Sequence, residues 1–267
     1  MTFKKSAALL LILIALFTPE EPAHTQRTKS SLSSGNQRRS EKGLKDNKYF
    51  FYFINSTVSN YGTGRQVEIF TEALRRDLIA RILYMKFSFD DSFAEVKQSQ
   101  ILMIELYRNV LIQEIKETRI ILGESAAEVL QANEYMPKKY LGLGYRSVKW
   151  ADKTMLMADN LPETNYSIRL YEYVKAIKNV KTARRYAIVA LLEKRIPPER
   201  RKEINYNNYG QVKELISEYI AEDKEKYLLM HRDNYYMIEP GQSLYEKIMD
   251  EPGLENIPEY STYMKDK

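Results

Sequence analysis

One stretch of this chain constrains the fold more than any other: residues 92–122 contain neither glycine nor proline. The stretch opens with Ser92 and, three residues later, Glu95, a pattern typical of a helix N-terminus. Gly123 follows it, and glycine readily adopts the left-handed turn after a helix. Apolar residues recur inside it at helical spacing, namely Ile104, Tyr107, Leu111, Ile115 and Leu122. The sequence therefore predicts a helix of about 45 Å, which indicates an elongated body.

The rest of the chain also favours helices. Helical spacing covers 65–87, 137–160, 162–196 and 212–230, and a serine-glutamate pair at Ser243 and Glu246 opens a short last helix. The aromatic segment 49–59 has no strand to pair with, so we expect it to be an extended segment or a helical turn. The predicted fold is all-α, an elongated and irregular assembly of long helices.

We expect two lobes that divide near residues 123–137. The N-terminal lobe spans residues 49–130 and includes the long helix 92–122, and the tyrosine-rich C-terminal lobe spans residues 131–252. The polar segment 253–267 is expected to be a flexible tail.

Residues 1–25 have the pattern of a secretory signal peptide. Lys4 and Lys5 precede an unbroken apolar run of 11 residues from Ala7 to Phe17, and small residues follow near Ala23. The alternative is a membrane anchor, but the run is shorter than the roughly 20 residues that span a bilayer. The sequence contains no cysteine. Export without disulfides fits a bacterial periplasm or the extracellular space.

The net charge of +5 is concentrated in one segment. Residues 26–48 carry seven basic and two acidic side chains, whereas residues 49–267 carry 32 of each. We expect 26–48 to be a basic disordered tail, with a tether for an acidic surface as the alternative. A basic pI therefore does not indicate a nucleic-acid partner.

The sequence offers few groups for catalysis. His24 lies near the predicted cleavage site, so His231 is expected to be the one histidine of the mature chain, at the surface or capping a helix. This excludes the usual zinc sites and most Ser-His-Asp systems. No phosphate-binding glycine loop is present. We expect a non-enzymatic protein without cofactor or metal, although a lytic enzyme that uses one glutamate stays open.

Tyrosine is unusually frequent. The chain has 21 tyrosines, and 16 of them lie from Tyr135 onward. Tyrosine and arginine are enriched at contact surfaces. Segment 195–209 combines both, so we predict a partner-binding surface made by Arg195, Arg200, Arg201, Tyr206 and Tyr209. The alternative is a charged linker with its tyrosines turned inward. The single tryptophan, Trp150, is expected in the core.

Residues 183–210, ARRYAIVALLEKRIPPERRKEINYNNYG, resemble the flagellar-coiling proteins of Leptospira. The resemblance covers about 137–240 and brings no catalytic residues. It implies a sheath protein of the periplasmic flagellar filament that contributes to coiling and motility, with flagellin and other sheath proteins as partners. It also implies a periplasmic location and no stable membrane insertion once the signal is removed. The alternative is a periplasmic helical adaptor or binding module.

Overall fold

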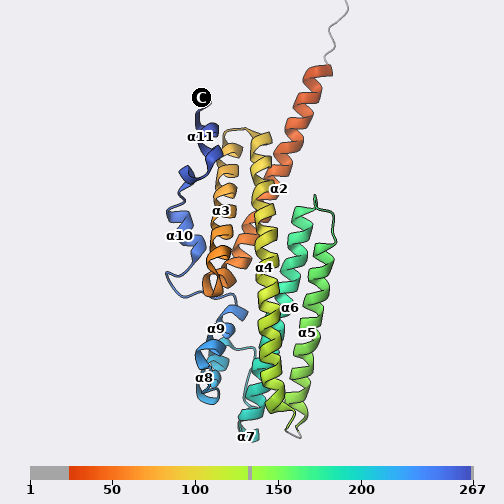
Figure 1. The fold of residues 1–267 in the computed structure, drawn as a ribbon, viewed down its shortest axis with the longest axis vertical. Coiled ribbons are helices and arrows are strands. Elements are labelled where there is room, and N and C mark those ends of the chain that lie inside the picture. The colour runs from red at the N-terminus through yellow and green to blue at the C-terminus, as the bar shows by residue number, and fades with distance from the viewer. Residues whose placement is uncertain (1–23, 132–133, 266–267) are drawn as a thin grey trace, which may run out of the picture.

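The computed structural model describes residues 24–131 and 134–265, and all secondary structure in these residues is helical (Figure 1). This confirms the predicted all-α fold. Long helices lie along the long axis of an elongated body, and shorter C-terminal helices pack along one side (Figure 1). None of the described helices is long and apolar enough to cross a lipid bilayer.

Helix α2 (His24–Tyr61) corrects one expectation and supports the helical alternative of another. It includes residues 26–48, which we expected to be disordered, and the aromatic segment 49–59. The reason is packing on one side of a basic helix: Asn47 is buried and its Nδ2 donates to Asp77 Oδ1 at 2.8 Å. At Gly43 a Cβ atom would lie 2.4 Å from Val96 Cγ1, so the glycine lets α2 approach helix α4 (Phe89–Val129) closely. The first 23 residues of the predicted signal peptide, 1–25, lie outside the described residues.

Helices α3 (Gly64–Met85) and α4 (Phe89–Val129) are the helices predicted at 65–87 and 92–122, and they pack as an antiparallel pair. At 41 residues, α4 is about 60 Å long. It is longer than predicted because Ser92 does not cap it; the Ser92 hydroxyl instead donates to Ala80 O at 2.8 Å. Nor does Gly123 end it. The residues around it, Leu122, Ser125 and Val129, are buried, and this packing outweighs the cost of about 1 kcal/mol for a glycine inside a helix.

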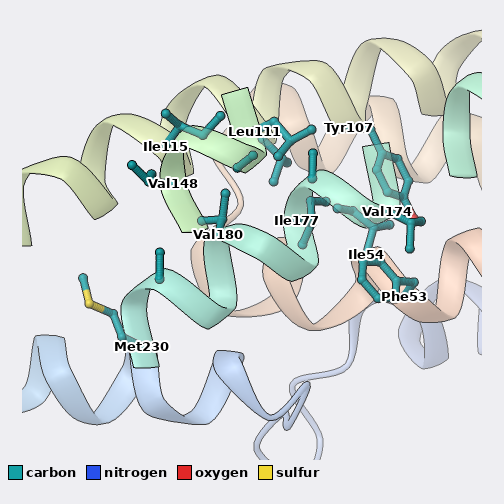
Figure 2. Packing of buried hydrophobic residues seen from close by; sticks show 14 of the residues in the cluster. Phe53, Ile54, Tyr107, Leu111, Ile115, Val148, Val174, Ile177, Val180 and Met230 are labelled. Atoms are coloured by element: carbon teal, nitrogen blue, oxygen red, sulfur yellow. The ribbon is translucent and has the colours of Figure 1, made fainter. Parts of the chain in front are cut away.

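Helices α5 (Tyr135–Asp159) and α6 (Tyr166–Arg195) complete the body. One continuous core runs from Phe50 to Ile248, and Figure 2 shows residues of α2, α4, α5, α6 and α9 meeting in it. Two separate lobes are therefore not present in the described residues. The reason is α4, which packs on α2 and α3 along one part and on α5 and α6 along the other.

The C-terminal part consists of α7 (Pro198–Arg201), α8 (Tyr209–Tyr219), α9 (Lys224–Asn234), α10 (Leu244–Asp250), η1 (Leu254–Asn256) and α11 (Pro258–Lys265). The helix predicted at 212–230 is two helices, separated at Asp223, whose φ is 55°. The predicted cap at Ser243 is confirmed, since Ser243 Oγ accepts from Glu246 N at 3.3 Å.

The segment 253–267 was expected to be flexible, but its described part is docked on α3. Ile257 packs with Ile79 and Leu83 in a small second cluster. Arg76 pairs with Glu259 at 3.1 Å, and the Tyr263 hydroxyl donates to Glu95 Oε1 at 3.0 Å. The polar composition of this segment does not indicate these contacts, but they are enough to position a short helix.

Candidate binding surface

The five residues predicted to bind a partner lie around the end of α6, α7 and the start of α8. Two of their guanidinium groups hold the fold together. Arg195 donates to both carboxylate oxygens of Glu128 on α4, at 2.9 and 2.8 Å, and to Tyr219 O at 3.0 Å. Arg201 donates to Ile196 O at 2.7 Å and pairs with Glu134. These two arginines are therefore occupied by internal contacts.

Arg200 is exposed, as a partner-binding residue would be. Its guanidinium pairs with Glu218 at 2.7 Å and also donates to the Tyr219 hydroxyl. The hydrogen bond from Arg200 lowers the pKa of Glu218. Arg200 is thus a surface residue in a local pair with α8, apart from the cavity described below.

Tyr209 is half-buried against His231. The two rings are stacked with centroids 4.7 Å apart and planes within 5°. His231 was expected at the surface or capping a helix. It lies in the last turn of α9 (Lys224–Asn234) but is only 2 % exposed, and its Nε2 lies 2.9 Å from Tyr209 O. Burial lowers the pKa of His231, which favours the neutral ring and a hydrogen bond from Nε2 to that carbonyl. His231 therefore anchors the start of α8.

A cavity of about 320 Å³ lies beside these residues, between α5, α6 and the segment that precedes α8. We call it the tyrosine pocket. Thr182, Arg185, Tyr186 and Val189 form one stripe of α6 along it, because residues three, four and seven positions apart share a helix face. The full lining is Tyr140, Thr182, Arg185, Tyr186, Val189, Tyr206 and Asn207.

Three tyrosine rings form the walls of the tyrosine pocket. Tyr140 stacks on Tyr186 with centroids 6.2 Å apart and meets Tyr206 edge-on, also at 6.2 Å. Burial, reinforced by the nearby carboxylate of Glu193, raises the pKa of Tyr206. Burial raises the pKa of Tyr140 as well. Both hydroxyls therefore stay protonated and can donate hydrogen bonds at any physiological pH.

Arg185 supplies the positive charge of the tyrosine pocket. Its guanidinium lies over the Tyr235 ring at 5.0 Å, and Nη2 donates to Asn207 Oδ1 at 3.1 Å. The remaining N–H groups of a guanidinium can donate to a carbonyl or carboxylate oxygen. Flat aromatic walls and one arginine suit an apolar or planar group attached to an acceptor oxygen, such as part of a polypeptide.

The structure brings one predicted residue, Tyr206, into this pocket and places Tyr209 next to it. Arg195, Arg200 and Arg201 lie elsewhere. Sequence reasoning missed Tyr140 and the stripe of α6, although the spacing of 182, 185, 186 and 189 was a usable signal. Trp150 was expected in the core, but it is 52 % exposed.

No group of three or more histidines, aspartates or glutamates suited to a metal ion occurs in the described part of the chain. The fold and the tyrosine pocket define an elongated, all-helical protein with a cavity walled by tyrosine rings. Residues 34–262 match the family model described as "Surface protein adhesin OmpL37", and the chain belongs to this family. No curated protein and no solved structure matches it. The matched family is a surface-adhesin family, so a flagellar sheath role stays a prediction.

Proposed function

We propose that this protein is an exported, non-enzymatic binding protein that works as an adhesin at the bacterial surface. Its family is described as one of surface protein adhesins, and the match extends over most of the chain. The observation that carries the proposal is the tyrosine pocket, which combines three tyrosine rings and Arg185 in one cavity. Tyrosine and arginine are the residue types that dominate the energetics of protein interfaces.

The ligand class that fits is an extended protein segment. Its side chain would lie between Tyr140 and Tyr186, and a backbone carbonyl or a carboxylate would accept from Arg185. A rigid helix stripe forms one wall, so little conformational entropy is lost on binding. The binding-module alternative drawn from the sequence is therefore retained, with the cell surface in place of the periplasm.

The test is binding of the full purified protein to extracellular matrix laid down by cultured fibroblasts. We expect saturable binding that Tyr186→Ala or Arg185→Ala weakens by at least about tenfold, because each removes a central contact. The matched control is Tyr52→Ala, whose ring is 78 % exposed on α2, outside the tyrosine pocket.

A second variant separates loss of binding from loss of folding. Thr182→Arg adds a long side chain beside the tyrosine pocket without deleting an aromatic ring, and it should also reduce binding. Saturable matrix binding that all three pocket variants leave unchanged would refute the site.

The alternative is the sheath role implied by the resemblance of residues 183–210. Surface labelling of intact bacteria distinguishes the two roles. Antibody access without membrane disruption supports the adhesin, whereas recovery only with purified periplasmic filaments would overturn it and favour the sheath.

A further inference from the structure

The outward face of α5 carries exposed basic and large apolar side chains and no acidic ones. The exposed positions of this helix recur at intervals of three and four and so form one continuous strip along its length. We call this strip the α5 face. Its members are Tyr135, Met136, Lys138, Lys139, Gly142, Tyr145, Arg146, Lys149, Trp150, Lys153, Leu156, Met157 and Asn160, the last being the residue that ends the helix.

All charged residues on the α5 face are basic. None of its five cations, Lys138, Lys139, Arg146, Lys149 and Lys153, forms an ion pair within the described residues. The helix contains two aspartates, but both lie at the flank of the α5 face and form ion pairs with arginines of α4. Arg119 pairs with Asp152, and Arg108 pairs with Asp159 at 3.3 Å.

Large apolar side chains stand between these cations. Tyr135 is 74 % exposed, Leu156 60 % and Met157 52 %. Trp150 is 52 % exposed, and the Lys153 ammonium lies 4.9 Å from its ring centroid. Single exposed apolar residues are normal on a protein surface. Here the exposed tryptophan, leucine and methionine stand beside lysines, and these are the residue types with which helices bind a membrane interface.

Position in the fold makes the α5 face accessible. Helix α5 packs on α6 and α4 with its other side and forms an outer edge of the body in Figure 1. Tyr140, which lines the tyrosine pocket, lies outside the strip of exposed positions. A surface contacted by the α5 face would therefore leave the tyrosine pocket to bind a different partner.

We propose that the α5 face docks the protein peripherally on an anionic phospholipid membrane. The lysines and Arg146 lie over the lipid headgroups, while Trp150, Leu156 and Met157 enter the boundary with the acyl chains. Charge alone would also fit a sulfated glycan or an acidic protein. The exposed leucine and methionine favour lipid over a sulfated glycan, because these apolar side chains are stabilised by leaving water and a glycan offers them no apolar surface.

Trp150 is the only tryptophan of the chain, so its fluorescence reports directly on the α5 face. The full purified protein is mixed with vesicles of phosphatidylcholine plus phosphatidylglycerol, and with vesicles of phosphatidylcholine alone. We expect co-sedimentation with the anionic vesicles, a shift of Trp150 emission to shorter wavelength, and quenching by brominated acyl chains. Added salt should weaken binding, because it screens the headgroup charge.

Two variants test the two parts of the α5 face. Lys149→Glu with Lys153→Glu should weaken vesicle binding at least about thirtyfold, since each lysine at an anionic surface contributes about a factor of five. Leu156→Ser with Met157→Ser should weaken it while leaving the salt dependence in place. The matched control, Lys202→Glu with Lys213→Glu, changes the net charge equally at exposed positions near α7 and on α8, and should bind like the wild type.

The proposal is overturned if anionic vesicles neither sediment the protein nor shift Trp150 emission. It is equally overturned if the control pair weakens binding as much as the Lys149 and Lys153 pair does. Binding of soluble heparin with no vesicle binding would assign the α5 face to a glycan and refute the lipid proposal. Circular dichroism of each variant checks that the helices are intact, so that a loss of binding can be distinguished from a loss of folding.

Discussion

Two adjacent helices, α5 and α6, both carry several lysines and arginines, and the structure uses these charges in opposite ways. On α6, the side chains of Lys181 and Arg184 are 3 % and 1 % exposed. On α5, Lys149 and Lys153 are exposed and form no ion pair among the described residues. Neighbouring helices of similar composition thus contribute a buried ionic network and an open basic surface.

The buried network is centred on Asp233 of α9. Its carboxylate accepts from Lys181 Nζ at 2.8 Å and from Arg184 Nη2 at 2.6 Å. Ser56 and Thr57 of α2 also donate to it, at 3.1 and 3.2 Å. The network therefore ties α9 to α2 and α6 across about 50 to 180 residues of sequence, as the separations of these pairs show.

Glu114 of α4 completes the charge balance. Its Oε1 accepts from Arg184 at 3.1 Å, but its Oε2 has no hydrogen-bond partner among the described residues. Burial raises the pKa of Glu114, and the positive charge of Arg184 only partly opposes this effect. A buried cation needs its partners because desolvation is costly, whereas an exposed cation does not.

Removing the charge of Asp233 should have the largest effect. Asp233→Asn leaves Lys181 and Arg184 buried without their shared anion, and we expect a loss of about 3–5 kcal/mol in the free energy of unfolding. Urea unfolding followed by circular dichroism measures it.

The matched control for this loss is Asp152→Asn on α5, whose partner Arg119 is 56 % exposed in its side chain. It should cost less than about 1 kcal/mol. Equal losses in the two variants would show that burial does not determine how much these ion pairs contribute to stability.

The second prediction concerns pH. Burial by itself would raise the pKa of Asp233, but Lys181 and Arg184 outweigh burial and hold the pKa below its ordinary value of 3.8. Its stabilising contribution is therefore present above about pH 3.8 and is lost as pH falls through the lower pKa of the folded state.

The measurement is the difference in unfolding free energy between the wild type and Asp233→Asn as a function of pH. The difference should be largest near neutral pH and should close as the solution becomes strongly acidic. A difference that stays constant into strong acid would mean that Asp233 does not stabilise the fold through its charge.

The smallest expected effect on stability is on α5 itself. Trp150→Phe should change the unfolding free energy by less than about 0.5 kcal/mol, because Trp150 is half exposed and its Nε1 makes no hydrogen bond within the described residues. In the wild type, acrylamide should quench Trp150 fluorescence strongly without vesicles. Weak quenching in solution would place Trp150 in a contact absent from the structure and would remove the basis of the α5 face.

Much of the fold could be predicted from local patterns. The helices at 65–87 and 137–160, and the short helix that begins at Ser243, follow from periodicity and capping. The candidate site was predicted only in part. Tyr206 was found because it lies in an arginine-tyrosine segment, but Tyr140 and Tyr186 join it from two other helices, a contact that no local pattern encodes.

Sequence by itself determined that this chain is all-helical, that its longest helix is centred near residues 92–122, and that tyrosines gather in the C-terminal half. These features depend on interactions between residues within a few positions, which periodicity records. Only the tertiary structure decided which basic residues are buried, that residues 26–48 are helical, and that Trp150 faces outward. Those outcomes depend on desolvation and on partners distant in sequence, such as Asp233 for Lys181, so they are fixed when the helices pack.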